Sequence, residues 1–426
     1  MTASTDHSAP RIEVARERFT LGCGATLLVH RRPGAPVTAV RVHVRGGPSL
    51  DPVGKDGVAY LTGSLADQGT PSRSDEDIAA LLEPEGGAVG GDALGLSGAV
   101  AGAAWRVLFD VLGELVADAS YPDARIERQF DRIKTRLAAE AEDPRAQGGI
   151  RFKPLIYGDK HFLGRNAYGT LESLGRISAA DLRVHRAEQW CGARLIIAVA
   201  GDVEPEEVRA YAERAFKAVP VGTPHEWSKS TFPPIEPRRA SFERDRQQVH
   251  VHLGHLGIER AHPDYVALVV MDHVLGTGTG FTNRITRKLR DEMGLAYTVH
   301  ADIHGTAGLN PGMFHAYIGT SPEHVGTAID GFLSEMRRIR DERVPDEELS
   351  VAKSYLVGSF AMGFERAARR ASYLVSAEVH GFPDDHLERL PAAFAAITSE
   401  EVQSAAQAHL HPDACSISVA GPAVEF

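Results

Sequence analysis

The sequence predicts an α+β protein made of two homologous domains, each a largely antiparallel sheet covered by helices. At 426 residues the chain exceeds the roughly 100–200 residues that one domain commonly uses. Residues 177–201 also align without a gap to residues 397–421, which indicates an internal duplication. Within each half the pattern runs from strands to helices and back to strands, as expected when helices cover one face of a sheet. The other face of each sheet should then be free to line a cavity.

The duplicated segment predicts a helix followed by a short strand in each half. The first copy reads ISAADLRVHRAEQWCGARLIIAVAG and the second reads ITSEEVQSAAQAHLHPDACSISVAG. Ser178 and Thr398 stand where an N-cap would open each helix, and both copies end in Val-Ala-Gly. A second correspondence aligns two strands with alternating apolar residues, namely Val40, Val42 and Val44 with Val249, Val251 and Leu253.

Local patterns predict the remaining elements. Pro33 and Gly34 favour a hairpin turn between two apolar runs. One helix is predicted in each half from apolar residues at helical spacing, through Ile126, Phe130, Ile133 and Leu137, and through Phe281, Ile285 and Leu289. Gly294 should end the second of these helices. Residues 219–239 are rich in proline and polar residues and are typical of a linker, so the predicted domains are residues 1–218 and 240–426.

Composition excludes several classes of protein. Hydrophobic residues make up 43% of the chain and charged residues 24%, which rules out a mainly disordered or fibrous protein. The longest uncharged apolar stretches fall short of the roughly 18–20 residues that span a bilayer, and the N-terminal segment lacks the apolar core of a secretory signal. Three scattered cysteines fit a reducing compartment, so a soluble, cytoplasmic protein is expected. A net charge of −11 argues against nucleic acid or an anionic membrane as a partner.

Four motifs, taken in order, resemble the insulinase/pitrilysin family of inverzincin peptidases. They are Gly57–Leu65 (GVAYLTGSL), Leu275–Arg284 (LGTGTGFTNR), Leu289–Tyr297 (LRDEMGLAY) and Tyr317–Pro322 (YIGTSP). The mitochondrial processing peptidase belongs to this family. The resemblance extends over nearly the whole chain and implies two homologous domains, in agreement with the internal duplication.

The resemblance also implies that this chain has lost the zinc site of its active relatives. Those relatives carry His-x-x-Glu-His on the helix that here begins at Gly57, with both histidines as zinc ligands and the glutamate as general base. Tyr60, Gly63 and Ser64 occupy these positions, and Arg136 stands where we place the third ligand, a glutamate. Without ligands and a base, the chain is expected to hold no metal or other cofactor and to be inactive alone.

Arg290 and Tyr297 point to a supporting role in catalysis. They are seven residues apart, and in competent members of the family an arginine and a tyrosine at this spacing hold the substrate backbone beside the zinc. A guanidinium offers a rigid fork of donors, and a phenol can donate to the oxyanion of a tetrahedral intermediate. The resemblance thus implies the non-zinc subunit of a heterodimeric zinc peptidase, with zinc expected in a homologous partner. Without the resemblance, Arg290 would be interpreted as a solvated helix charge and Tyr297 as a strand aromatic.

Two glycine-rich segments are candidate contacts for a peptide substrate. Gly276, Gly278 and Gly280 lack the last glycine of a GxGxxG motif, so a phosphate-binding loop is not expected. The resemblance links this loop to substrate handling. Gly91 and Ala93 lie in residues 86–100, which the resemblance makes the edge strand along which a peptide would lie. The glycines there leave two alternatives, a close docking edge or an edge that no longer binds peptide.

Two alternatives to an enzyme subunit remain, a structural scaffold and a peptide-binding homodimer. The retained Arg290 and Tyr297 favour the enzyme subunit, because a scaffold has no chemical need for them. Alternating polar residues could share one strand face at His250, His252 and His255, and again at His300, Asp302 and His304. Among nineteen histidines such patterns arise easily by chance, so no metal is assigned to them.

Overall fold

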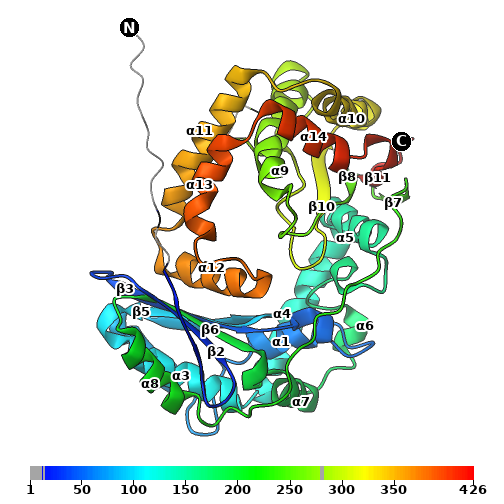
Figure 1. The fold of residues 1–426 in the computed structure, drawn as a ribbon. Helices are drawn as coiled ribbons and strands as arrows, with labels where there is room; N and C mark the ends of the chain where they lie inside the picture. The colour runs from blue at the N-terminus through cyan, green and yellow to red at the C-terminus, as the bar shows by residue number, and fades with distance from the viewer. Residues whose placement is uncertain (1–11, 13–14, 279–282) are drawn as a thin grey trace.

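The computed structural model describes residue 12, residues 15–278 and residues 283–426, and its strands form two sheets (Figure 1). The first sheet contains β1 (Glu17–Thr20), β2 (Thr26–Arg31), β3 (Val37–Val44), β4 (Ala88–Asp92), β5 (Gly95–Ala101) and β6 (Leu195–Gly201), in the order β1-β2-β6-β3-β5-β4. The second contains β7 (Arg239–Glu243), β8 (Val249–Leu256), β9 (Val299–Asp302), β10 (Met313–Thr320) and β11 (Ser416–Gly421), in the order β7-β11-β8-β10-β9. The paired strands are antiparallel except β2 with β6 and β7 with β11. The predicted α+β class is therefore confirmed.

Helices account for most of the remaining described chain. Those of the first half are α1 (Val58–Ser64), α2 (Asp75–Leu82), α3 (Trp105–Asp118), α4 (Asp123–Glu142), α5 (Pro144–Tyr157), α6 (Leu171–Leu174), α7 (Ala179–Gln189) and α8 (Pro205–Ala215). Those of the second half are α9 (Tyr265–Asp272), α10 (Val325–Asp341), α11 (Asp346–Gly363), α12 (Ala367–His380), α13 (His386–Ala396) and α14 (Ser399–His409), with two π-helical segments, η6 (His273–Thr277) and η7 (Thr286–Glu292). Short 3-10 turns are η1 (Gly47–Leu50), η2 (Glu83–Glu85), η3 (Gly102–Ala104), η4 (Phe162–Gly164), η5 (Gly192–Arg194), η8 (Pro322–His324) and η9 (Pro412–Ala414).

The duplicated segments form the predicted helix and strand in both halves. Ser178 caps α7 and Thr398 caps α14, each in a reciprocal capping box with the residue three positions on, Asp181 or Glu401. The strands that follow, β6 and β11, are fully buried near the middle of their sheets. The two halves thus share one local plan.

The second sequence correspondence is two residues out of register. Val40 of β3 pairs with Val199, and Val251 of β8 pairs with Val419, the duplicate of Val199. The structural equivalent of Val40 is therefore Val251 and not Val249. Because side chains alternate with a period of two, this even shift leaves the same residues facing the core, which is why the pattern alone could not reveal it.

The predicted hairpin at Pro33 and Gly34 is wrong. A turn does form there, since the Ala35 N–H donates to the Arg32 carbonyl at 3.1 Å. However, β6 lies between β2 and β3 and pairs with both. A strand from more than 150 residues further along the chain, β6, has displaced the local pairing that the turn suggested.

The predicted helix around Ile126 is confirmed as α4, and the one around Ile285 is confirmed over its described part. Ile126 and Ile133 are buried in the first core, with Phe130 and Leu137 packed against it. Ile285 and Leu289 are fully buried in the second half, whereas Phe281 lies outside the described residues. Gly294 follows η7 with a φ of +64°, a conformation that suits glycine, and so ends the helix as predicted.

Each half of the chain lends one helix to the sheet of the other half. α5, from the first half, packs on β7, β8 and β11, and α12, from the second half, packs on β2, β3 and β6. In Figure 1 α12 lies on the opposite side of the first sheet from α3 and α8. A separate core that includes Leu28, Ala198 and Leu374 fills this contact. The expectation that the second face of each sheet is free is therefore wrong for these strands, because apolar strands such as β6 need cover on both faces.

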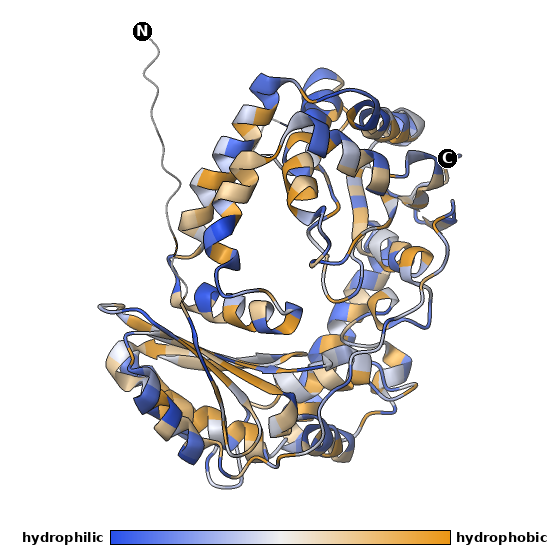
Figure 2. Ribbon diagram, viewed as in Figure 1, coloured by the Kyte–Doolittle hydropathy of each residue, from blue (hydrophilic) through white to orange (hydrophobic). Residues whose placement is uncertain are grey.

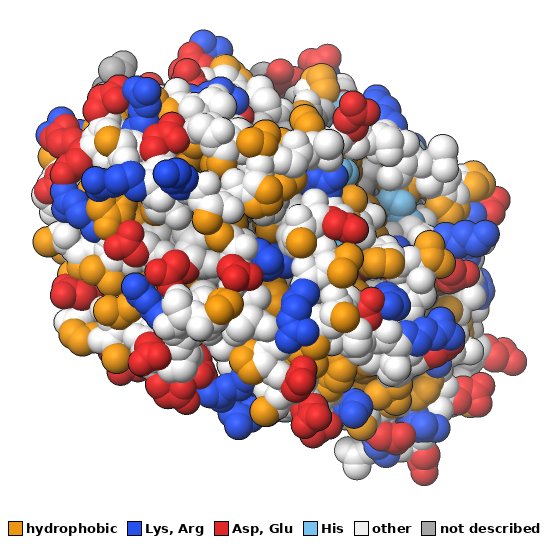
Figure 3. Space-filling view, turned by 90° about the horizontal axis from the view of Figure 1, so that it is seen from below, with side chains coloured by type: hydrophobic (Ala, Val, Ile, Leu, Met, Phe, Trp, Pro, Cys, Tyr) orange, Lys and Arg blue, Asp and Glu red, His pale blue; other side chains and the backbone are white. Residues whose placement is uncertain are grey.

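The two largest cores lie between each sheet and the helices of its own half. Figure 2 shows hydrophobic residues concentrated along the first sheet and on the sides of the helices that face it. Seen from below, the surface instead carries interspersed acidic and basic side chains (Figure 3). Neither helix nor strand occurs from residue 220 to residue 238, within the predicted linker, while the exact domain limits stay a prediction. Within the described chain, no helix combines the length and apolarity needed to cross a bilayer.

Imidazoles line the face of the second sheet near α5. The Nδ1 atom of His252 lies 3.0 Å from the Nε2 atom of His315, and the His300 ring packs edge-on against that of His315. Burial lowers the pKa of His252 to about 4 and that of His315 to about 3. Burial also lowers the pKa of His250 and of His300. These histidines are therefore neutral in the folded protein at neutral pH.

Acidification is expected to destabilise the packing of α5 against the histidines of the second sheet. Unfolded imidazoles take up a proton near pH 6.5, whereas folded His252 and His315 do so only near pH 4 and pH 3, so stability falls as the pH drops from 6.5 towards 4. We expect the free energy of unfolding to fall by at least about 1 kcal/mol between pH 6.5 and 5. The melting temperature measured as a function of pH reports this fall. His315→Gln should flatten this dependence, while replacing the exposed His324 by Gln should not. If His315→Gln left the pH dependence of the melting temperature unchanged, the loss of stability in acid would come from other titrating groups.

Candidate functional site

Arg290 and Tyr297 lie together at an open cavity of about 330 Å³. The guanidinium carbon of Arg290 is 5.0 Å from the centre of the Tyr297 ring, in a cation–π arrangement. Gly276 and Gly278 line the same cavity, with Asn283, Thr286, Thr298 and Val299 completing it. The Tyr297 side chain is 84% exposed, so its ring and hydroxyl are open to a ligand. Two of the sequence motifs, Leu275–Arg284 and Leu289–Tyr297, thus meet at one place.

Asn283 fixes the entry to the helix that carries Arg290, and it was not identified from the sequence. Its side-chain amide donates to the Gly278 carbonyl at 2.8 Å, and its side-chain oxygen accepts from the Thr286 N–H at 2.8 Å. The residue is buried, so both bonds are shielded from water. An asparagine directly before the helical residues was the available signal, because an N-cap side chain accepts the N–H two or three positions further along the chain.

Glycine at position 276 allows the π-helical segment η6 to touch the edge of the second sheet. A Cβ placed on Gly276 would lie 2.3 Å from the carbonyl oxygen of Ala301 in β9. The glycine therefore has a packing role, in addition to any contact with substrate. Gly280 lies outside the described residues.

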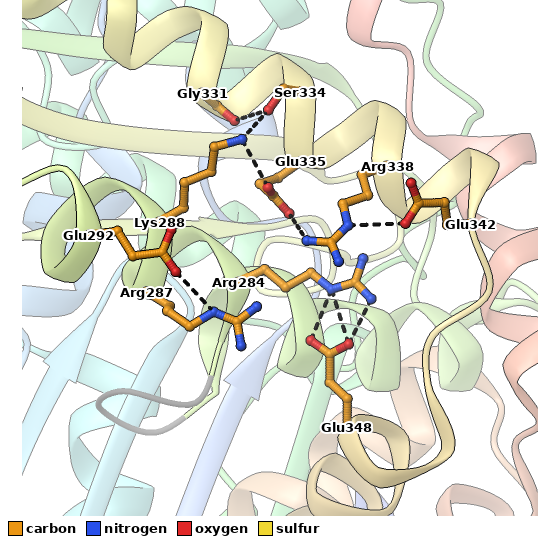
Figure 4. Close-up of polar contacts among 10 residues, drawn as sticks. All are labelled: Arg284, Arg287, Lys288, Glu292, Gly331, Ser334, Glu335, Arg338, Glu342 and Glu348. Atoms are coloured by element: carbon orange, nitrogen blue, oxygen red, sulfur yellow. Dashed lines mark hydrogen bonds and ion pairs between the residues drawn. The ribbon is translucent and has the colours of Figure 1, made fainter.

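A network of ion pairs anchors η7 to the helices behind it (Figure 4). Arg284 forms a two-pronged pair with Glu348 of α11, at 2.9 Å and 2.7 Å, and its side chain is only 1% exposed. Lys288 donates to Ser334 at 2.5 Å and to the buried Glu335 at 3.1 Å, both on α10. These contacts hold the segment between the glycine loop and Tyr297, and so they set the position of Arg290.

Aromatic and cationic side chains occupy two of the positions at which the resemblance places a lost zinc site, Tyr60 and Arg136. Tyr60 of α1 packs against Tyr168, with ring centres 6.0 Å apart. The Arg136 guanidinium lies 4.0 Å above the Tyr168 ring and donates to Glu140 at 2.9 Å. The Tyr168 hydroxyl donates to the same carboxylate, and its pKa is raised by burial and by Glu140. Glu140 is thus engaged with a cation and a phenol, which is a poor arrangement for a metal ion.

Gly63, at the position of the general base, faces the backbone of another element. A Cβ on Gly63 would lie 1.7 Å from the Asp92 carbonyl oxygen, and a Cβ on Gly91 would lie 2.0 Å from the Gly63 carbonyl oxygen. Helix α1 and strand β4 therefore touch backbone to backbone. Ser64, beside Gly63, directs its hydroxyl to the Leu61 carbonyl at 3.5 Å within its own helix.

The predicted edge strand is confirmed, because β4 is the last strand of the first sheet. Gly91 lies in β4 and Ala93 in the turn that leads to β5. The glycine at position 91 serves the contact with α1, which explains its presence without a peptide. Gly91 and Ala93 belong to the first sheet, whereas Arg290 and Tyr297 flank the second, and binding of a peptide along β4 stays a prediction.

One further cluster was not anticipated from the sequence. His262, Asp264 and His409 place their ligand atoms within 4.8 Å of one another, the only such group among the described residues. The His409 Nε2 atom and an Asp264 carboxylate oxygen are 2.7 Å apart, and the Asp264 N–H donates to His262 Nδ1 at 3.1 Å. These bonds tie the end of α14 to the start of α9, which accounts for the cluster without an ion.

Comparisons with known proteins agree with the family resemblance. The profile of the family described as "Peptidase M16 inactive domain" matches residues 176–356. An uncharacterized zinc protease of Mycobacterium tuberculosis is 25% identical over 424 residues, which covers 97% of this chain and 94% of that protein. The peptidase M16 inactive domain from Pseudomonas fluorescens superposes with a TM-score of 0.89 at 23% identity, covering 96% of this chain and 98% of that one. A protease from Helicobacter pylori gives a TM-score of 0.84 at 16% identity, with coverage of 96% and 100%.

Proposed function

Because the chain carries the inactive domain of the M16 peptidases, the insulinase/pitrilysin family, we propose that it is the zinc-free subunit of a two-subunit zinc peptidase. In this proposal a homologous partner carries His-x-x-Glu-His and the zinc ion, and this chain supplies Arg290 and Tyr297 to the shared site. The complex would hydrolyse peptides in the cytoplasm. The chain by itself would be inactive.

The observation that carries the proposal is the cavity shared by Arg290, Tyr297, Gly276 and Gly278. A large aromatic ring that is 84% exposed gains nothing from burial in this chain, so it is available to a ligand or a partner. The neighbouring guanidinium adds fixed positive charge and a fork of donors suited to backbone carbonyls. Such a pair can orient a peptide and stabilise the negative oxygen that forms when water attacks it.

The lost zinc site supports a division of labour between two chains. Glu140, the carboxylate beside Arg136 and Tyr168, is already engaged with both of them, and Gly63 leaves no room for a general base. Hydrolysis would therefore need a zinc ion held elsewhere. Arg290 and Tyr297 would act on a substrate bound at the zinc of the partner.

The test is to produce this chain with and without a homologue that has an intact zinc motif. We expect only the mixture to form a one-to-one complex that contains zinc and cleaves a quenched peptide library. Arg290→Gln and Tyr297→Phe should each lower kcat/KM at least about tenfold, while complex formation is retained. The first removes a positive charge and its fork of donors from the charged transition state, and the second removes the phenol donor. Arg287→Gln is the matched control, since it removes the same charge from the same segment outside the cavity. Wild-type turnover in both variants would refute the catalytic role.

An inactive homologue, either a scaffold or a peptide-binding homodimer, is the second candidate. The packing that closes the lost zinc site favours it, because Tyr60, Arg136 and Tyr168 form a settled structural cluster. A chain that dimerises with itself, ignores the zinc-bearing homologue and stays inert in the same experiment would establish this alternative.

A further inference from the structure

A second cavity, of about 510 Å³, lies where α4, α5, residues 164–168 and β8 come together. Its volume is in the range of pockets that hold small molecules or a few residues of peptide. Arg136 and Tyr168 of the lost zinc site form part of its wall. Strand β8 contributes one side chain from the second half of the chain, that of His252.

The charge of this cavity is opposite to that of the whole chain. The protein has 57 acidic and 46 basic residues, yet the cavity is lined by Arg136, Arg145, Lys153 and Arg165 against only Glu140 and Asp143. A cavity with excess positive charge in an acidic protein concentrates anions by field focusing. The local excess therefore selects a negatively charged ligand.

Two of the cations are not neutralised by the protein. Arg136 donates to Glu140, and Arg165 forms an ion pair with Asp56. The Asp143 carboxylate accepts the backbone N–H of Arg145 at 2.9 Å and so caps α5. Arg145 and Lys153 form no ion pair with any residue in the described part of the chain. Their charges remain available to a ligand.

The geometry of α5 sets the spacing of the carboxylates that would fit. Arg145 and Lys153 are eight residues apart on one helix, or about 12 Å along its axis, with the Arg145 guanidinium 4.8 Å from the Tyr317 ring centre. Two acidic side chains four positions apart on an extended peptide point to the same side and are about 13 Å apart, which matches this spacing. The Nε2 atom of His252 is buried without a hydrogen bond of normal geometry, although the Arg145 carbonyl lies near, so it can serve a polar group of the ligand.

We propose that this cavity binds short acidic peptides, with Arg145 and Lys153 each holding one carboxylate. The choice of a peptide as ligand rests on the proposed function, but the cavity belongs to this chain alone and needs no partner subunit. Arg145 would hold its carboxylate through two parallel N–H bonds, and Lys153 would act as a point charge. The complex would then favour acidic substrates.

Isothermal titration of the full chain alone, without a partner, tests the proposal independently of peptide hydrolysis. The probes are acetyl-Glu-Ala-Ala-Ala-Glu-amide, its Gln-Ala-Ala-Ala-Gln counterpart, and inorganic phosphate. We expect the acidic peptide to bind at least about tenfold more tightly than either of the others, and to weaken at high salt. Arg145→Gln and Lys153→Gln should each weaken its binding several-fold, whereas Lys217→Gln, a charge removed far from the cavity, should change it less than about twofold.

Three results would overturn the proposal. Equal affinity for the acidic and neutral peptides would show that the carboxylates are not recognised. Phosphate binding as tightly as the acidic peptide would show a general anion site with no fit to peptide. Unchanged binding in both Arg145→Gln and Lys153→Gln would place the site elsewhere. Melting temperatures of the variants, expected to match that of the wild type because both side chains are exposed, exclude misfolding as the cause.

Discussion

Gly63→Ala is expected to lower the free energy of unfolding by more than about 3 kcal/mol. The added methyl would lie 1.7 Å from the Asp92 carbonyl oxygen, and neither backbone can move aside as a flexible side chain could. Alanine is intrinsically better than glycine inside a helix by about 1 kcal/mol, so the sign depends on which effect is larger. The overlap with a backbone atom is much the larger. Thermal unfolding of the soluble variant, or its loss to the insoluble fraction, measures the effect.

Gly90→Ala is the matched control, because Gly90 neighbours Gly91 in the same strand but has no atom within 4 Å of its Cβ position. We expect this change to be neutral or slightly stabilising, since alanine loses less backbone entropy on folding. A Gly63→Ala variant as stable as Gly90→Ala would show that the backbones of α1 and β4 are not in contact. The same contact explains why a general-base glutamate cannot simply be restored at position 63.

The local elements of the fold could be predicted from capping residues and hydrophobic periodicity. Ser178 and Thr398 were identified as N-caps because the bond they accept comes from three residues along the chain. The hairpin at Pro33 failed for the opposite reason, since β6 arrives from far along the chain and pairs with both strands. The exchange of α5 and α12 between the sheets was missed as well, because an apolar helix face does not reveal which sheet it will cover.

The sequence indicated part of the candidate site, but neither Asn283 nor the packing around it, and the roles of the indicated residues stay predictions. The resemblance pointed to Arg290 and Tyr297, and the structure places both at one cavity. The reason for Gly63 and Gly91 was not visible, because a glycine that permits close approach and a glycine that bends a strand look alike in a sequence. Nor could charge alone identify Arg284 as buried, since arginine is ordinarily a surface residue.

Glu348→Ala is expected to destabilise the second half of the protein by about 3 kcal/mol. Its partner Arg284 is 1% exposed, so removal of the carboxylate would leave an uncompensated positive charge in the core. Arg284 stands six residues before Arg290 in the same segment, so loss of the Arg284–Glu348 ion pair should also weaken the positioning of Arg290. Urea unfolding reports the stability, and peptide cleavage by the assembled complex reports the position of Arg290.

Glu342→Ala tests whether the burial of Arg284 is the cause of the stability loss expected in Glu348→Ala. Glu342 pairs with Arg338 at 3.2 Å, but its side chain is 63% exposed, and pairs of this kind contribute less than about 1 kcal/mol. The double change of Arg284→Met with Glu348→Leu should recover most of the stability lost in Glu348→Ala, because an apolar pair leaves no buried charge. If Glu348→Ala proved no more harmful than Glu342→Ala, or if the double change were as harmful as Glu348→Ala alone, the cost would not come from an unpaired Arg284. The anchoring of the Arg290 segment would then depend on Lys288 and its contacts with Ser334 and Glu335.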